Sequence, residues 1–285
     1  MPPTSWILAD VLSGPAVLLQ LRIRSAGSST GLVEERVAYG DHPAQHFLFL
    51  QPEASSTETP LVYFIHGGSW RHGSPATYRA VGRFLASQGY AVALGGYRLA
   101  PEHVFPAQLD DVFAGLVAAV THARSAGVRA EPVLLAGQSA GAHLAALAAF
   151  DDDSRGAAGL GHLRLAGLLA VSGPLDFDLL CPEPGDCPLV EGLMGGREGW
   201  DVANPVRYVH GAAPLPVLCV HGARDPRVPS AVSVSFVMRA NGTDGDHATF
   251  IADPTGHHAD MTRLLLGSSP ILSPVLEWMA AAARS

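Results

Sequence analysis

Short apolar runs alternate with longer amphipathic stretches along most of the chain. A compact apolar run bounded by polar or glycine-rich turns predicts a buried strand, and apolar residues at helical spacing predict a helix. The strands expected on this basis lie at 61–65, 90–96, 132–136, near 167, at 216–220 and 248–252, and the helices lie near 77–88, 107–126 and 140–150. Such a βαβ rhythm is typical of a mostly parallel central sheet with helices on both faces, so the predicted fold class is α/β.

Three parts of the chain depart from this rhythm. Alternating polar and apolar residues over 32–39 and 46–50 predict an antiparallel hairpin at the sheet edge. An N-terminal segment, residues 1–30, and a glycine- and proline-rich stretch at about 178–200 lie outside the βαβ units, and both are expected to cover the site, the second as a small lid. Residues 1–285 are predicted to form one domain, because α/β folds often reach this length without dividing.

The pentapeptide from Gly137 to Gly141 reads Gly-Gln-Ser-Ala-Gly and lies between a predicted strand and a predicted helix. A Gly-x-Ser-x-Gly sequence in this context is typical of a nucleophile elbow, in which the serine is held in a strained backbone conformation with its Oγ exposed. The two glycines let strand and helix approach closely enough for the turn to close. Ser139 is therefore the candidate nucleophile.

The sequence His-Gly-Gly-Ser-Trp follows the first predicted parallel strand. Acyl transfer places negative charge on a carbonyl oxygen, and backbone N–H groups aimed at that oxygen stabilise the charge. The N–H groups of Gly67 and Gly68, together with that of Ala140, are the candidate oxyanion hole. Ser69 and Trp70 are the candidate substrate-binding residues, and we expect Trp70 to narrow the pocket.

A serine nucleophile needs an imidazole that accepts its proton and a carboxylate that orients the imidazole. In nucleophile-elbow enzymes the acid and then the histidine follow the serine along the chain, each at a strand end. Asp225 follows the strand at 216–220 and is the predicted acid, while Asp176 and Asp178, at the end of an earlier strand, are the rival candidates.

Together these motifs resemble the esterase, lipase and arylformamidase branch of the α/β-hydrolase superfamily. Tyr-Arg-Leu-Ala-Pro-Glu-His at 97–103 and Phe-Pro-Ala-Gln-Leu-Asp-Asp at 105–111 are similar to segments of the hormone-sensitive-lipase-like esterases. The His-Gly-Gly-Ser-Trp loop and residues 37–45 look more like the kynurenine-formamidase and feruloyl-esterase-like group. The resemblance covers nearly all of the chain from about residue 32 and implies an α/β-hydrolase fold.

Two adjacent histidines follow the last predicted strand, and one of them is the expected general base. A Gly-His pattern favours His257. In related hydrolases the catalytic histidine commonly stands two residues before an acidic residue that opens the next helix, and His258 has this relation to Asp260. His258 is the predicted base, and His257 stays open as the alternative.

The activity predicted from these residues is that of a serine carboxylesterase, which hydrolyses short-chain carboxylic esters through an acyl-enzyme intermediate. The alternative is an arylformamidase that cleaves N-formylkynurenine with the same triad. A third candidate, from another class, is a hydrolase-fold binding protein without turnover. The predicted chemistry requires no cofactor and no metal, and the expected partner is a small-molecule ester.

The composition further restricts the classes of partner that the protein can bind. Hydrophobic residues make up 48% of the 285 residues, which is ample for a sheet buried on both faces, and the net charge of −8 argues against nucleic-acid binding. No segment has the roughly 18 consecutive apolar residues of a membrane span, and the N-terminus lacks the basic region of a secretory signal. A cytoplasmic protein is expected, with a homodimer left open.

The three cysteines have no metal-site spacing. Cys219 is expected in a core strand. Cys181 and Cys187 are close enough in sequence to close a small loop, but free thiols are expected in a reducing compartment.

Overall fold

A computed structural model describes residues 30–181, 187–196, 198–209, 215–243 and 245–284. Within the N-terminal segment it describes residues 4, 5, 7, 10, 16, 17, 19–21, 23 and 24. Parts of the N-terminal segment and of the predicted lid therefore lie outside the described residues.

The described residues form one sheet of eight strands in the order β1-β2-β4-β3-β5-β6-β7-β8. The strands are β1 (Leu32–Ala38), β2 (His46–Pro52), β3 (Pro60–Ile65), β4 (Ala91–Gly95), β5 (Arg129–Gln138), β6 (Leu165–Val171), β7 (Val217–Gly222) and β8 (Ala248–Asp253). β2 pairs antiparallel with β1 and β4, and every other neighbouring pair is parallel. The predicted edge hairpin and mostly parallel sheet are thus confirmed.

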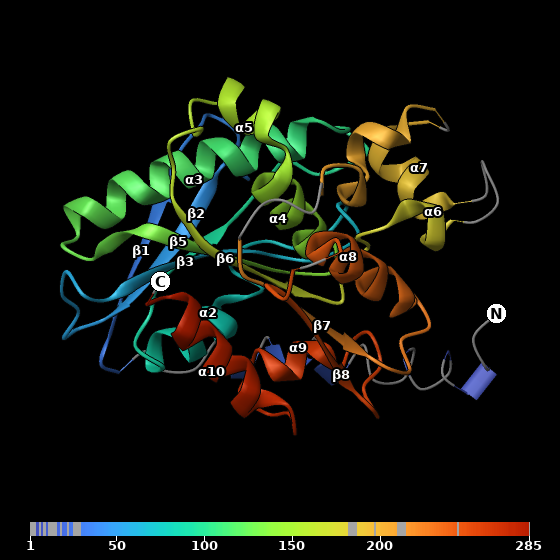
Figure 1. Ribbon diagram of the computed structural model, residues 1–285. Helices are drawn as coiled ribbons and strands as arrows, with labels where there is room; N and C mark the ends of the chain where they lie inside the picture. The colour runs from blue at the N-terminus through green and yellow to red at the C-terminus, as the bar shows by residue number, and fades with distance from the viewer. Residues whose placement is uncertain are drawn as a thin grey trace.

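Helices connect and cover these strands (Figure 1). They are α2 (Arg79–Ser87), α3 (Ala107–Ser125), α4 (Ala140–Phe150), α5 (Asp152–Ala157), α6 (Phe177–Leu180), α7 (Pro188–Met194), α8 (Ala231–Asn241), α9 (Met261–Leu264) and α10 (Leu272–Ala282), with short 3₁₀ turns at Trp200–Ala203 and Pro205–Arg207. In the part of the chain that the structure describes, no helix has both the length and the apolar character needed to cross a bilayer.

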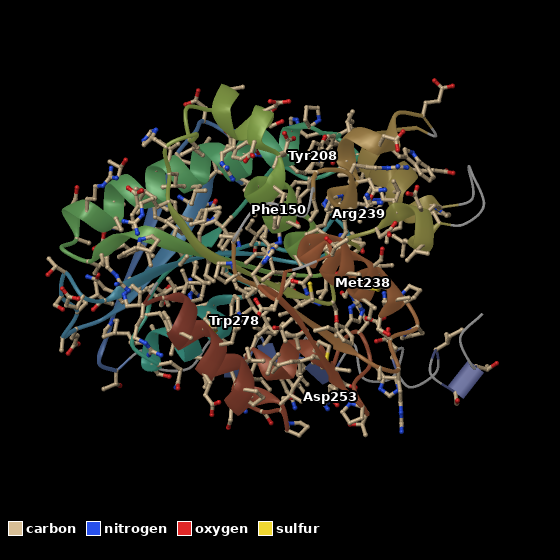
Figure 2. The ribbon with its side chains drawn as sticks, viewed as in Figure 1. Phe150, Tyr208, Met238, Arg239, Asp253 and Trp278 are labelled. Atoms are coloured by element: carbon tan, nitrogen blue, oxygen red, sulfur yellow. A yellow bond between two sulfur atoms is a disulfide. The ribbon has the colours of Figure 1, made fainter. Side chains whose placement is uncertain are left out.

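The sheet separates two apolar clusters, because successive side chains of a strand point to opposite faces. In β3, Tyr63 belongs to the cluster under α3, α4 and α8, and Phe64 belongs to the cluster over α2, α9 and α10. Figure 2 labels Phe150, which belongs to the first of these clusters, and Trp278, which packs against the second. Burial on both faces explains why these strands read as continuous apolar runs in the sequence.

Cys181 and Cys187 form a disulfide, with their Cα atoms 5.6 Å apart. The expectation of free thiols at these two positions is therefore wrong: α6 ends and α7 begins within disulfide reach of each other. Cys219 lies buried in β7, as predicted, and is a free thiol.

Candidate active site

The turn from β5 into α4 places Ser139 at the carboxyl edge of the sheet. Ser139 has a φ of 53°, which is uncommon for a residue with a side chain, and its N–H donates to the carbonyl of Val171 at 2.8 Å. Gly141 lets α4 lie against β3, because a Cβ there would come 2.0 Å from the carbonyl oxygen of Ile65. The chain therefore makes the strained strand-to-helix turn that the pentapeptide indicates.

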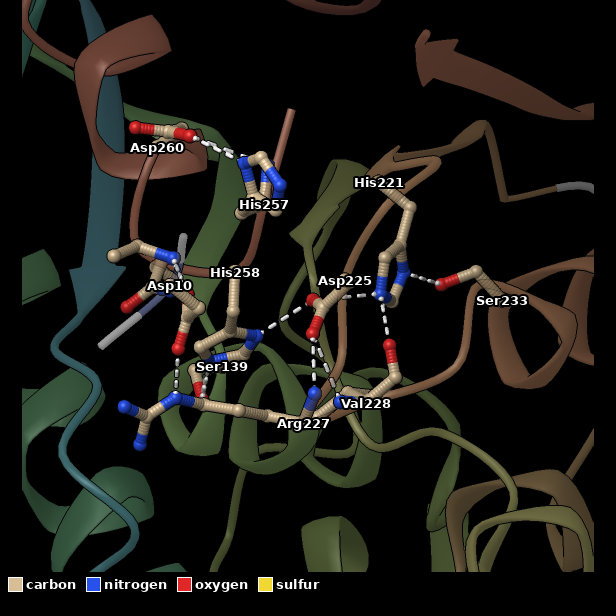
Figure 3. A network of polar contacts seen from close by, with 12 residues as sticks. Asp10, Ser139, His221, Asp225, Arg227, Val228, Ser233, His257, His258 and Asp260 are labelled. Carbon is tan, nitrogen blue, oxygen red and sulfur yellow. Dashed lines mark hydrogen bonds and ion pairs between the residues drawn. The ribbon is translucent and has the colours of Figure 1, made fainter. Parts of the chain in front are cut away.

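Ser139, His258 and Asp225 come together from three separate strand ends (Figure 3). Nε2 of His258 lies 3.0 Å from Oγ of Ser139, and Nδ1 of His258 lies 2.6 Å from Oδ2 of Asp225. The parallel order of β5, β6, β7 and β8 creates this meeting, because the carboxyl ends of parallel strands lie at one edge of the sheet.

The Asp225 carboxylate is completely buried and held by several donors. Its Oδ1 accepts the backbone N–H groups of Arg227 and Val228, each at 2.9 Å. Burial alone would raise the pKa of Asp225, but the neighbouring His258 and hydrogen bonds from His221 and His258 hold that pKa well below its usual range. An ionised carboxylate is an acceptor only, so Nδ1 of His258 donates to it and Nε2 is left to accept the Ser139 hydroxyl proton.

The rival residues from the sequence have other partners. Nδ1 of His257 faces the carboxylate of Asp260 at 3.1 Å. Asp176 accepts backbone N–H groups at the start of α6, and Asp178 pairs with Arg207. In the described part of the chain, none of these three side chains forms a hydrogen bond or ion pair with Ser139 or His258.

The loop after β3 is shaped by a buried imidazole and a glycine. Nδ1 of His66 donates to the carbonyl of Gly67 at 2.9 Å, and the ring stacks on Tyr97 with centroids 4.3 Å apart. Burial lowers the pKa of His66 to about 4, so the ring stays neutral at pH 7. Gly68 has a φ of 131°, and a Cβ there would come 2.1 Å from the carbonyl oxygen of His72.

Gly68 and Ser69 line the pocket beside Ser139, whereas Gly67 is buried behind them against Gln138. The N–H groups of Gly68, Ser69 and Ala140 donate to no protein acceptor within the described residues. For Ala140 the reason is general, because the first N–H groups of a helix have no intrahelical partner.

Trp70 does not contact the pocket, contrary to the expectation that it binds substrate and narrows the site. Its side chain is completely buried in the apolar cluster under α4, and its ring meets His143 edge-on with centroids 5.0 Å apart. A backbone φ of 57° accompanies this inward direction.

A cavity of about 290 Å³ opens at Ser139 and His258. Ser139, His258 and the loop after β3 line it, together with Tyr78 and Gln138, whose hydroxyl and Oε1 form a hydrogen bond of 2.7 Å. Burial raises the pKa of Tyr78 to about 12, so this hydroxyl keeps its proton. Val17, Leu21 and Leu189 also line the cavity and form its apolar wall.

Comparison with known proteins places this site in a family. The family model described as BD-FAE matches residues 48–239, more than half of the chain. The chain belongs to the BD-FAE family. Its resemblance to esterases of the α/β-hydrolase superfamily is thereby confirmed.

Relatives of this BD-FAE family member carry esterase names. Over 242 residues it is 31% identical to Esterase LipC of Mycobacterium tuberculosis, which covers 79% of this chain and 60% of that protein. Over 239 residues it is 28% identical to the probable isoprenylcysteine alpha-carbonyl methylesterase ICMEL1 of Oryza sativa subsp. japonica, covering 78% of this chain and 56% of that protein. The chain thus spans less than two thirds of the length of these relatives.

Solved structures share the α/β-hydrolase fold. One, described as a truncated form of carbohydrate esterase from gut microbiota, has a TM-score of 0.78 at 21% identity and covers 91% of this chain and 99% of that chain. Another, described as an inhibited Esterase B from Lactobacillus rhamnosis, has a TM-score of 0.78 at 24% identity. It covers 98% of this chain and 96% of that chain.

The N-terminal segment of this BD-FAE family member is anchored beside the triad by a buried carboxylate. Asp10 accepts the backbone N–H of Ala259 at 3.0 Å and forms an ion pair with Arg227 (Figure 3). Ala259 follows His258, and Arg227 lies two residues after Asp225. No local motif marks Asp10 in the sequence, because its partners lie more than 200 residues away.

Proposed function

We propose that the protein is a serine carboxylesterase that hydrolyses short-chain carboxylic esters through an acyl-enzyme intermediate. The observation that carries this proposal is the hydrogen-bonded chain from Ser139 through His258 to Asp225 at the base of a small cavity. The esterase names of the relatives support the same reaction class.

In the acylation step, Oγ of Ser139 attacks the ester carbonyl carbon while its proton passes to Nε2 of His258. The carbon–oxygen double bond opens, and the electron pair moves onto the former carbonyl oxygen. When this oxyanion collapses, the bond to the alcohol oxygen breaks and His258 gives its proton to the leaving alcohol. Asp225 stabilises the imidazolium and holds its Nδ1–H in place throughout.

Water then repeats the sequence at the acyl-enzyme. His258 takes a proton from water, the hydroxide oxygen bonds to the acyl carbon, and the carboxylic acid leaves as Ser139 recovers its proton. We assign stabilisation of both oxyanions to the N–H groups of Gly68, Ser69 and Ala140, which have no protein acceptor in the described residues. Gly67 is buried and does not line the pocket, so it is not among these three donors. Its assignment to the oxyanion hole from the sequence stays a prediction.

The size of the cavity supports short acyl chains. Its volume of about 290 Å³ is at the lower end of ligand pockets, which are typically ~300–1,000 Å³. Each buried methylene contributes about 0.8 kcal/mol only where an apolar wall receives it. Val17, Leu21 and Leu189 provide that wall over a limited area.

A panel of p-nitrophenyl esters from acetate to decanoate, assayed beside N-formylkynurenine, tests the proposal. We expect kcat/KM to peak between acetate and about hexanoate, and Ser139→Ala to lose at least about 10⁴-fold of the activity while staying folded. Faster cleavage of N-formylkynurenine than of every ester would establish the arylformamidase alternative. Absence of turnover on the whole panel by the folded wild-type protein would favour the binding-protein alternative.

A further inference from the structure

A second histidine contacts the acid of the triad from the side opposite His258 (Figure 3). His221 lies in β7, and its side chain is completely buried. Its Nε2 lies 3.2 Å from Oδ2 of Asp225 and 2.9 Å from the carbonyl oxygen of Val228. Its Nδ1 lies 2.8 Å from Oγ of Ser233 in α8.

These contacts determine where the proton of His221 resides. Nε2 faces two oxygen acceptors, a carboxylate and a carbonyl, so it must carry a hydrogen. Ser233 can donate its hydroxyl hydrogen to Nδ1, which then needs no hydrogen of its own. A neutral imidazole protonated on Nε2 therefore satisfies every contact, and Ser233 selects that tautomer.

We propose that His221 is a positioning residue for Asp225, and that Ser233 fixes the tautomer in which it can act. The proposal rests on the esterase function proposed above. It extends the triad to a five-residue chain in which Ser233 donates to Nδ1 of His221, and Nε2 of His221 lies 3.2 Å from the same Asp225 oxygen to which His258 donates.

The geometry of the acid loop explains why a positioning group is needed there. Backbone N–H groups hold Oδ1 of Asp225, but without His221 only the imidazole of His258 would hold Oδ2. His221 also bonds the carbonyl of Val228, three residues further along the same loop. One imidazole thus fixes both the carboxylate and the chain that carries it, and Ser233 connects this arrangement to α8.

Other charged or titratable groups surround the triad. Those near the His258–Asp225 pair are Arg227 and Asp10 on the pocket side and His257, Asp260 and Arg263 on the histidine loop and the helix after it. Variants at His221 or Ser233 leave all of these groups in place. A change in the pH profile of such variants therefore reports on the contact between His221 and Asp225.

Removing the imidazole has two expected consequences. His221→Leu frees Oδ2 of Asp225 to move, and misplacement of a reacting group by about 1 Å costs up to ~10²-fold, so kcat should fall about ten- to a hundredfold. The carboxylate also loses a donor, which leaves more negative charge facing His258. The imidazolium of His258 is then more stable, and the acidic limb of kcat/KM should move to higher pH by about half to one unit.

A double variant separates positioning from stability. His221→Leu alone leaves Ser233 buried without a partner, whereas His221→Leu/Ser233→Ala removes both polar groups and should restore most of the melting temperature. We expect the double variant to keep the lowered kcat and the shifted limb. Ser230→Ala, at the start of the same helix, is the matched control and should behave as wild type. Wild-type kcat and an unshifted limb in the double variant would overturn the proposal.

A readout without turnover distinguishes this proposal from the esterase function itself. Nitrogen NMR of the imidazoles in Ser139→Ala should show neutral His221 with its hydrogen on Nε2 and none on Nδ1. Replacing Ser233 by Ala in that background should mix the two tautomers. A His221 ring that carries its proton on Nδ1 alone would overturn the inference even if the wild-type protein is an active esterase. Absence of esterase activity with the expected tautomer would instead contradict only the proposed function.

Discussion

The two walls of the pocket are held in place by different means. Ser139 and His258 stand at strand ends of the buried sheet, each next to a short local motif. The apolar wall is made by Val17 and Leu21 from the N-terminal segment and Leu189 from α7, and none of these three residues lies in a strand of the sheet. We infer that the first wall fixes the chemistry, and that the second can change acyl-chain preference without disturbing the triad.

The largest effect that would test this division comes from the adjacent histidines. His258→Ala should lower kcat/KM by at least about 10⁴-fold, because it removes the proton acceptor of Ser139. His257→Ala should keep substantial turnover, since His257 faces Asp260 instead. Steady-state assays with p-nitrophenyl butyrate measure both, and exchanged phenotypes would assign the base to His257.

Asp10 connects the two walls, and its loss should have an intermediate effect. Asp10→Ala leaves the N–H of Ala259 without its acceptor and Arg227 without its carboxylate, so kcat/KM should fall about tenfold. Asp246→Ala, at an exposed position, removes the same charge as a control. An Asp10→Ala variant as active as this control would mean that the N-terminal segment does not support the triad.

A smaller effect is expected from opening the apolar wall alone. Leu189→Ala should raise the kcat/KM of octanoate relative to butyrate by up to about fourfold for each methylene accommodated, which corresponds to ~0.8 kcal/mol. Hydrolysis of the acetate ester should change little. Leu179→Ala is the matched control, because the Leu179 side chain on α6 is half-exposed and lies outside this cavity. The same octanoate-to-butyrate ratio of kcat/KM in both variants would mean that Leu189 does not contact the acyl chain.

The smallest effect on catalysis is expected at the disulfide. Replacing Cys181 and Cys187 by Ser should lower the melting temperature by a few degrees, because closing so short a loop stabilises the fold by about 2 kcal/mol. Turnover of the acetate ester should stay within about twofold of wild type. Thiol titration of the denatured, unreduced protein should find one thiol, that of Cys219, and three thiols would contradict the bond.

The central strands β3 to β7 were predictable from the sequence because they are buried on both faces, and the edge hairpin was predictable from its alternating pattern. α8 was harder to recognise, since Ala-Val-Ser-Val-Ser-Phe alternates small polar and β-branched residues as a strand does. Tertiary packing overrides that pattern: Phe236 is buried in the apolar cluster under α8, and Ser233 is turned toward His221.

The site was predictable where a motif fixes the backbone and unpredictable where only side-chain direction decides. Ser139 follows from its pentapeptide, but neighbouring histidines differ only in which carboxylate they face. Trp70 adjoins the oxyanion loop in sequence and yet points into the core. Asp10 could not be found from the sequence, because only the folded chain brings it to Ala259.

Covalent labelling tests the central claim most directly, namely that His258 and Asp225 activate Ser139 as a nucleophile. Full-length protein treated with a fluorophosphonate should gain the mass of one phosphonyl group, and peptide mapping should locate it on Ser139. Ser139→Ala should stay unlabelled, and His258→Ala should react slower by orders of magnitude. Labelling of Ser139→Ala at the wild-type rate, or no labelling of the folded wild-type protein, would contradict the account.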